Sequence, residues 1–176
     1  MIIRDAIHTD LPGILAIYNE VIANSTAVYA FEPVNLADRA AWLENRQAKG
    51  FPVLVAAEGD DVLGFASYGE WRGAWPGYKY TVEHSVHIKA GRRGAGIGRQ
   101  LMQYLIHKAQ SAKLHVMLGA IDAENAASIQ FHERLGFTAV AHFHQTGHKF
   151  SRWLDLVFMQ LTLDPSQALP PVEPTG

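Results

Sequence analysis

The chain has 176 residues, of which 48% are hydrophobic, a formal net charge of -2 and no cysteine. These values predict one domain with an ordinary core, disfavour a nucleic-acid protein held by bulk charge, and exclude disulfides, thiolate metal sites and a cysteine nucleophile. Asp5 interrupts the N-terminal stretch and no segment has the ~20 apolar residues of a membrane span, so we expect a soluble, cytoplasmic protein without a signal peptide.

The first elements in chain order are a strand over residues 1–6 and two helices. Thr9 or Asp10 can cap the first helix, whose apolar residues between Ile14 and Ile22 repeat along one helical face. Asn35 followed by Asp38 resembles a capping box, which predicts a second helix that ends near residue 46.

Strands and helices then alternate, separated by glycine-containing turns. Glu58-Gly59-Asp60-Asp61 is a hairpin signal, and GEWRGAWPGYKY (69–80) predicts an ordered loop. Gly136 is placed to end a helix, and Gly147 marks the expected turn between the last two strands. The predicted strands are 51–57, 62–68, 80–88, 115–121 and two within 138–163, and the predicted helices begin at residue 97 and span 125–135.

The resulting order, β-α-α-β-β-β-α-β-α-β-β, predicts a mixed α/β or α+β sheet with helices on both faces. We expect a single domain over residues 1–164. Residues 165–176 are rich in proline, and we expect them to form a disordered tail.

The loop GRRGAGIG (91–98) is the strongest binding signal in the sequence. It is not a P-loop, because Ile97 and Gly98 stand where Lys and Ser/Thr are required, and Arg99 weakens a dinucleotide fingerprint without excluding it. The pattern Arg93-x-x-Gly96-x-Gly98 between a strand and a helix instead favours a pyrophosphate held by backbone N–H groups and the helix N-terminus.

A second motif follows this loop, NAASIQFHERLGF (125–137). Together the two motifs resemble the GNAT superfamily of N-acetyltransferases, from Ile2 to about Leu163. The stretches WRGAWPGYKYTVE, TVEHSVHI and HKFSRWLDLVFMQL are similar to its phosphinothricin and methionine sulfone (sulfoximine) acetyltransferase branch. The resemblance implies a mostly antiparallel sheet splayed at the cofactor site. It also implies acetyl-CoA as cosubstrate, no metal, and a small amino acid such as phosphinothricin, methionine sulfoximine or methionine sulfone as acceptor.

Residue roles follow from the same resemblance. Strand 80–88 is expected to hold the pantetheine through its backbone, and the glycine loop to hold the pyrophosphate. The cofactor-binding residues so implied are Val86, His87, Ile88, Arg93, Gly94, Ala95, Gly96, Ile97, Gly98, Arg99, Asn125 and Arg134.

Glu83 and His132 are the candidate catalytic residues. Glu83 is the expected general base, although a carboxylate needs burial or a relaying water to act as one. His132 stands where many family members have a tyrosine acid, so it is a competing acid or base. A glutamate paired with a surface cation and a histidine bonded on a helix flank are the plainer alternatives.

The acceptor is expected to contact the loop over residues 69–80, which we call the aromatic loop, and the middle of strand 80–88. Arg72 could clamp a substrate carboxylate through a bidentate pair. Packing alone is the commoner role for the aromatic residues. The substrate-contacting residues implied are Phe31, Arg72, Gly73, Ala74, Trp75, Glu83, His84 and Ser85, with Lys149 and Trp153 as weaker candidates.

Other readings remain open at this point. His142 and His144 would share one strand face with His148 nearby, but no acid or cysteine stands at ligand spacing, so we expect no metal site. The same fold could acetylate a protein N-terminus or an amine drug, and a non-catalytic acyl-CoA or dinucleotide sensor is a rival of another class. The resemblance also implies a homodimer, with no nucleic-acid or membrane partner.

Overall fold

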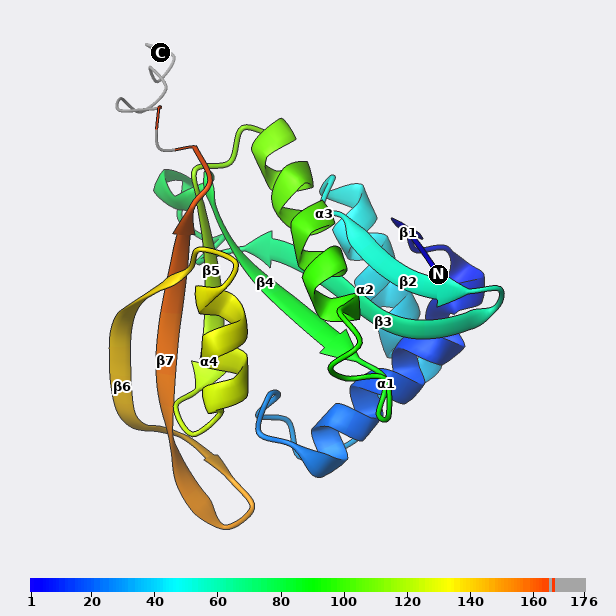
Figure 1. Ribbon diagram of the computed structural model, residues 1–176, viewed down its shortest axis with the longest axis horizontal. Coiled ribbons are helices and arrows are strands. Elements are labelled where there is room, and N and C mark those ends of the chain that lie inside the picture. Colours follow the sequence, from blue (N-terminus) through cyan, green and yellow to red (C-terminus); the bar gives the residue numbers. More distant parts are fainter. Residues whose placement is uncertain (165, 167–176) are drawn as a thin grey trace.

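The computed structural model describes residues 1–164 and residue 166 (Figure 1). Apart from Ser166, the predicted proline-rich tail lies outside the described residues. Within the described part, seven strands form one sheet in the order β1-β2-β3-β4-β5-β7-β6, and every neighbouring pair is antiparallel except β4 and β5. The strands are β1 (Ile2–Asp5), β2 (Val53–Glu58), β3 (Asp61–Glu70), β4 (Thr81–Ile88), β5 (Val116–Asp122), β6 (Thr138–Lys149) and β7 (Arg152–Thr162).

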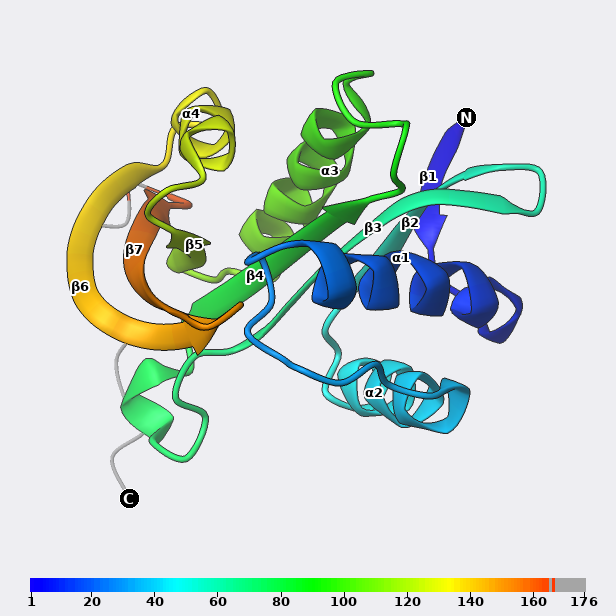
Figure 2. The same ribbon diagram turned by 90° about the horizontal axis from the view of Figure 1, so that it is seen from below.

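Helices cover both faces of this sheet, which confirms the predicted architecture and element order. Figure 2 shows α1 and α2 on one face and α3 and α4 on the other. Each face has its own apolar cluster, and β2 and β3 contribute to both. None of the described helices is long and apolar enough to cross a membrane. The helices are α1 (Leu11–Asn24), α2 (Leu36–Ala48), α3 (Ile97–Ser111) and α4 (Ala126–Glu133), with short 3-10 turns at His8–Asp10 and Pro76–Tyr78.

The helix ends show which local signals decided the fold. Asn35 and Asp38 form the predicted capping box, each side chain accepting from the other residue's backbone N–H at 3.0 Å. Asp10 occupies the N-cap position of α1, but its carboxylate accepts from Arg4 and from the N–H of Ile7 instead of capping that helix. The predicted capping role of Asp10 is therefore wrong, because a cation on β1 holds its side chain.

The expected turn at Gly147 is also wrong. β6 continues to Lys149, and the turn into β7 is made by Phe150 and Ser151, both with positive φ. Gly147 has a packing role instead: a Cβ there would lie 2.2 Å from the ring of Tyr29. The glycine thus allows a close approach between β6 and the loop that joins α1 to α2.

The sheet opens between β4 and β5. These strands pair only from Thr81 to Glu83 against Val116 to Leu118, although β4 runs on to Ile88 and β5 to Asp122. The unpaired halves diverge, as the resemblance implied for the cofactor site. Gly119 begins the unpaired half of β5, and a Cβ there would lie 2.7 Å from Nε2 of His84, so the glycine makes room for that ring.

Candidate active site

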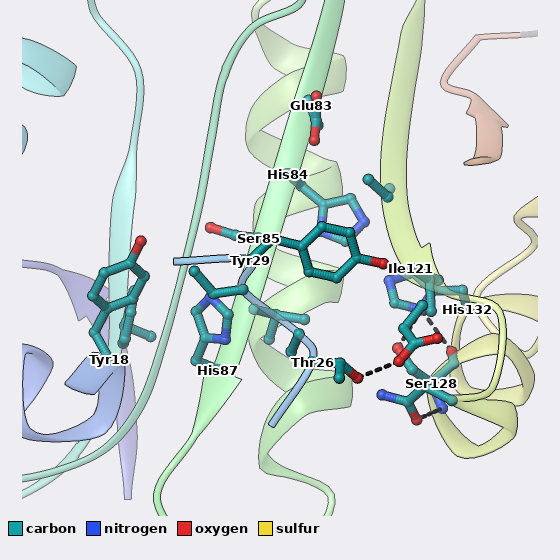
Figure 3. Close-up of a pocket in the computed structure, with 18 of the residues that line it drawn as sticks. Tyr18, Thr26, Tyr29, Glu83, His84, Ser85, His87, Ile121, Ser128 and His132 are labelled. Atoms are coloured by element: carbon teal, nitrogen blue, oxygen red, sulfur yellow. Dashed lines mark hydrogen bonds between the residues drawn. The ribbon is translucent and has the colours of Figure 1, made fainter. Parts of the chain in front are cut away.

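A cavity of about 560 Å³ lies at the opening between β4 and β5. Figure 3 shows side chains of β4 on one side, His132 and Ser128 of α4 on another, and Thr26 and Tyr29 of the α1–α2 loop reaching across. We call this space the central cavity. It is lined by Tyr18, Thr26, Ala27, Val28, Tyr29, Arg39, Trp42, Arg46, Phe65, Glu83, His84, Ser85, Val86, His87, Gly119, Ala120, Ile121, Asp122, Asn125, Ser128, His132 and Leu156.

β4 presents different groups to the two faces of the sheet, as its alternation predicts. His87 packs against Tyr18 and Phe65 on the α1 side, whereas His84 packs against His132 and Phe137 on the α4 side. Glu83, on the same face as His87, reaches the α2 side, where Arg46 acts on it electrostatically. Side chains from both faces of β4 therefore line the central cavity.

Glu83 is half-buried in the cavity wall. Burial raises its pKa above the usual value, and the positive charge of Arg46 opposes that rise. Arg46 reaches this position because Gly69, the cross-strand partner of Glu83, has no side chain: a Cβ there would lie 1.2 Å from a guanidinium nitrogen. A carboxylate with a raised pKa is a stronger proton acceptor than an exposed one, which is what a general base requires.

His132 is held in a defined orientation by its own helix. Its Nδ1 lies 2.7 Å from the carbonyl oxygen of Ser128, so Nδ1 carries the proton and donates it. Nε2 is then an acceptor, and it is buried without a hydrogen-bond partner within the described chain. Burial lowers the pKa of His132, partly offset by the Ser128 bond. The ring is therefore neutral near pH ~7 and suited to accept a proton rather than to donate one.

His84 stacks on His132, with ring centroids 5.0 Å apart and an interplanar angle of 27°. Burial, together with the neighbouring His132 and His87, lowers the pKa of His84 to about 3. Burial and two arginines lower the pKa of His87 to about 4. All three rings are thus neutral, and the cavity has an uncharged imidazole wall on each side of β4.

The buried side-chain polar atoms that lack a protein partner share one location. In the part of the chain that the structure describes, they belong to Tyr29, Arg39, His84 and His132, and all four residues line the central cavity. Buried polar groups are ordinarily hydrogen-bonded, so such a concentration calls for an explanation. A polar ligand that fills the cavity would satisfy them.

Two guanidinium groups line the cavity on the α2 side. Arg39 lies 4.3 Å from the ring centroid of Tyr18 and 5.0 Å from that of Trp42. Burial lowers the pKa of both Arg39 and Arg46, and no carboxylate lies within 4.0 Å of either among the described residues. They give the cavity a positive wall without a protein counter-ion at contact distance.

The glycine loop forms an open cradle between β4 and α3. Gly91, Gly94 and Gly96 all have positive φ, and a Cβ at any of them would meet nothing within 4 Å. Within the described chain, the backbone N–H groups of residues 94–98 have no main-chain acceptor. Arg93 does not turn into the loop, since its guanidinium donates to Glu20 of α1 at 3.0 Å. The cradle can therefore bind an anion through its backbone.

The structure brings together only part of the predicted site. Glu83, His84, Ser85, Val86, His87, Asn125 and His132 line the central cavity. Asn125 also caps α4 by accepting from the N–H of Ser128. The predicted residues that lie outside the lining are Phe31, Arg72, Gly73, Ala74, Trp75, Ile88, Arg93, Gly94, Ala95, Gly96, Ile97, Gly98, Arg99 and Arg134.

The predicted carboxylate clamp, Arg72, is exposed and lies 5.3 Å from the ring centroid of Tyr78. Lys149 is buried with its Nζ bonded to backbone carbonyls, so it does not face the cavity. Sequence reasoning missed Tyr18, Tyr29, Arg39 and Arg46. No sequence pattern marked them, because only the fold brings α1, α2 and the loop between them to the opening between β4 and β5.

The sequence-based argument against a metal site is wrong on one point. It found no acid at ligand spacing from His142 and His144, but Asp155 of β7 lies within hydrogen-bond distance of both rings. The acid comes from the partner strand of the hairpin, where sequence spacing cannot reveal it.

Comparison with known proteins identifies the class to which this fold and site belong. The acetyltransferase (GNAT) family matches residues 14–137. The chain is 53% identical over 169 residues to the L-methionine sulfoximine/L-methionine sulfone acetyltransferase of Pseudomonas aeruginosa, covering 96% of this chain and 98% of that one. The chain therefore belongs to the GNAT family of acetyltransferases.

Two solved structures agree with this assignment. A Salmonella typhimurium protein solved with its cofactor acetyl-CoA has a TM-score of 0.92 at 44% identity, covering 97% of this chain and 98% of its own. A phosphinothricin acetyltransferase from Sinorhizobium meliloti in complex with acetyl-CoA has the same TM-score at 33% identity, covering 98% and 94%. The predicted GNAT fold is confirmed.

Proposed function

We propose that this enzyme transfers the acetyl group of acetyl-CoA to the α-amino group of a small amino acid such as methionine sulfoximine, methionine sulfone or phosphinothricin. The observation that carries the proposal is the cavity between the splayed strands, where the unpartnered buried polar atoms gather beside Glu83. The names of the full-length relatives support the acceptor class.

The chain's own residues fit acetyl-CoA. Beyond Glu83, β4 has no partner strand on the β5 side, and Val86 and Ile88 direct their backbone groups to that side, whereas those of His87 pair with Phe65 of β3. The open glycine cradle offers N–H groups for a pyrophosphate. Acetyl-CoA supplies a thioester, which a neutral amine attacks at the carbonyl carbon. The new C–N bond replaces the C–S bond, and the CoA thiol leaves with a proton.

Glu83 is the proposed base for this reaction. An amino acid arrives as an ammonium, and only the neutral amine carries the attacking lone pair. Glu83 accepts that proton directly or through a water, helped by its raised pKa. His132 is the competing base through Nε2. Because the pKa of His132 is lowered, its Nε2 carries no proton for the leaving thiolate near pH ~7, and the proton on Nδ1 is bonded to Ser128.

The positive wall formed by Arg39 and Arg46 offers a binding site for the carboxylate of the acceptor. Arg39 lines the cavity with an unpartnered, buried Nε, which favours it for the α-carboxylate. Arg72 remains the alternative from the family resemblance. The proposed acetyl transfer needs no metal. We further propose that the enzyme works in the cytoplasm as a homodimer, without nucleic-acid or membrane partners, in detoxification of such amino acids.

The test is release of CoA thiol from acetyl-CoA by the purified enzyme with a panel of acceptors. We expect turnover with methionine sulfone, methionine sulfoximine and phosphinothricin, and none with their N-acetylated forms, which lack a free amine. Turnover only with a peptide N-terminus or an amine drug would replace the acceptor class. Acetyl-CoA binding without turnover on any amine would favour a sensor.

A further inference from the structure

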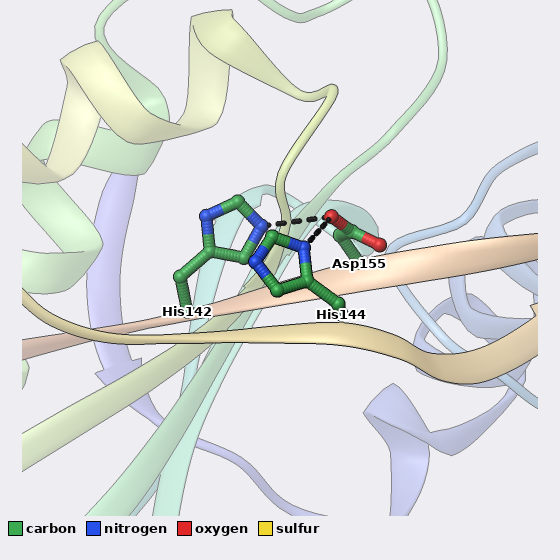
Figure 4. Close-up of side chains that lie close together, drawn as sticks. All are labelled: His142, His144 and Asp155. Carbon is green, nitrogen blue, oxygen red and sulfur yellow. Dashed lines mark hydrogen bonds and ion pairs between the residues drawn. The ribbon is translucent and has the colours of Figure 1, made fainter.

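A cluster of three metal-ligating side chains lies on the β6–β7 hairpin, outside the central cavity. Nε2 of His142 and Nδ1 of His144 each lie 2.9 Å from the same carboxylate oxygen, Oδ2 of Asp155. The three ligand atoms lie within 4.8 Å of one another. Figure 4 shows both imidazole rings, from β6, turned toward the carboxylate of β7.

A bulge in β6 creates this arrangement. Phe143 pairs with Leu156 and Gly147 pairs with Leu154, so three residues of β6 stand opposite Asp155 alone. Within the bulge, Gln145 has a φ of +52°, a conformation that a non-glycine residue rarely adopts. Such bulges re-aim side chains, and here the bulge directs His144 to the carboxylate that His142 also reaches.

The carboxylate is itself fixed. The N–H of Gln145 donates to Oδ1 of Asp155 at 2.8 Å, which leaves Oδ2 to face the two histidines. The backbone oxygen of Asp155 accepts from the N–H of Ala123 at 3.0 Å, so β7 is anchored at this point to the segment that follows β5.

We propose that His142, His144 and Asp155 form a binding site for a divalent transition-metal ion of the zinc type. Imidazole nitrogens and a carboxylate oxygen are ligands that Zn²⁺ accepts, at distances of about 2.0–2.2 Å. Tetrahedral ligands at that distance lie about 3.3–3.6 Å apart. The observed contacts of 2.9 Å would need to widen by only a few tenths of an ångström.

The site is exposed, with exposed side-chain fractions of 46% for His142 and 77% for His144. Solvent would therefore supply the remaining ligand. None of the three residues belongs to the lining of the central cavity in the described chain. We assign the ion a structural role, which is to join the bulged part of β6 to β7.

The experiment measures zinc binding to the full-length enzyme after chelator treatment and dialysis, by titration calorimetry with Zn²⁺ alone. We expect one ion per chain. Asp155→Asn keeps an oxygen acceptor for Gln145 and should weaken binding at least about tenfold, since losing a ligand costs no less than losing an outer-shell partner. His142→Ala/His144→Ala should abolish it. His107→Ala, which removes an exposed histidine on α3, is the matched control and should bind as the wild type does.

A second measurement follows the ring nitrogens by ¹⁵N NMR during the titration. We expect the ¹⁵N resonances of Nε2 of His142 and Nδ1 of His144 to shift on coordination, because these are the two nitrogens that face Asp155. The proposal is overturned if zinc binds the double variant as tightly as the wild type. It is equally overturned if both nitrogens keep their protons at saturating zinc, which would make the cluster a hydrogen-bonded triad.

Discussion

At the level of single residues, the catalytic assignment depends on two opposing effects on the pKa of Glu83. Burial raises its pKa, and Arg46 opposes that rise. The net shift is upward, so the carboxylate binds a proton more strongly than that of an exposed glutamate. His132, whose pKa moves down, becomes a weaker base than an exposed histidine. The two candidates thus predict different dependence on pH.

We predict that Glu83→Gln reduces turnover by about 10²- to 10⁴-fold, the usual contribution of a positioned base. The amide keeps the shape of the side chain but cannot accept the proton. The wild-type rate should fall as pH decreases through the raised pKa of Glu83, and this acidic limb should vanish in the variant. The loss should shrink as pH rises, because the amine then deprotonates in solution.

His132→Ala is the matched comparison for this experiment, with acetyl-CoA affinity and thermal unfolding as checks that both variants fold. If Glu83→Gln keeps its turnover near pH ~7 while His132→Ala loses it, the base is His132.

Recognition of the acceptor is decided by which arginine meets its carboxylate. We predict that Arg39→Met raises the Michaelis constant for methionine sulfone about 10- to 100-fold, as expected for loss of a charge-assisted pair worth about 1.5–3 kcal/mol. The constant for acetyl-CoA should not change. Arg72→Ala is measured beside it. An effect of Arg72→Ala alone would move the carboxylate site to the aromatic loop.

Among the structural elements, the glycine loop offers a direct test of cofactor binding. Gly96→Ala introduces a Cβ at a φ of +79°, with no atom to clash with, so the strain acts through the backbone conformation. We predict a rise of at least about tenfold in the acetyl-CoA Michaelis constant, because the N–H groups of the cradle lose their orientation. Gly59→Ala, at φ +58° in the β2–β3 turn, carries similar strain and should leave that constant unchanged.

The loop between α1 and α2 depends on a residue far along the chain. Nζ of Lys149 donates to the carbonyl oxygens of Ile22, Ser25 and Val28 at 2.6–2.7 Å. These bonds hold the loop that brings Thr26 and Tyr29 to the cavity. Thr26 in turn donates to the buried carboxylate of Asp122. Lys149 is therefore a positioning residue for this wall of the site.

We predict that Lys149→Met lowers the melting temperature and raises the acceptor Michaelis constant more than it lowers turnover, because the loop loses its anchor while Glu83 is untouched. Lys113→Met, at an exposed position in the turn that follows α3, is the control. An equal effect of both variants, or a fall in turnover alone, would contradict the positioning role.

These same elements show what the sequence could reveal. Local signals were sufficient for the capping box at Asn35 and the helix stop at Gly136, since all the interacting groups are neighbours in sequence. They failed for the loop at Tyr29 and for the pair of histidines with Asp155. In both cases the partner lies on the β6–β7 hairpin, and only the folded sheet brings it into contact. The turn at Phe150 and Ser151 was missed because both residues have positive φ, which Gly, Asn and Asp adopt more readily than Phe or Ser.

At the scale of the whole molecule, the buried histidines of the central cavity lower the stability of the folded protein at acidic pH. The buried histidines of β4 are neutral in the folded protein, with pKa values lowered to about 3 for His84 and about 4 for His87. In the unfolded chain each titrates near ~6.5. Below that pH the unfolded state binds protons that the folded state does not bind. The part of the unfolding free energy that is present above pH ~6.5 is therefore lost as pH falls toward those lowered values.

We predict that each of the two histidines adds about 1.2 kcal/mol to the loss of unfolding free energy between about pH 6 and pH 5. Urea unfolding at a series of pH values measures this slope. His84→Gln and His87→Gln should each reduce it by that amount, whatever they do to absolute stability, and exposed His107→Gln should not. The raised pKa of Glu83 contributes to the slope with the opposite sign. Because Glu83 is present in the wild type and in all three variants, its contribution cancels when their slopes are compared. Equal slopes in all four would mean that the two rings take up protons in the folded state, and that the cavity wall is charged in mild acid.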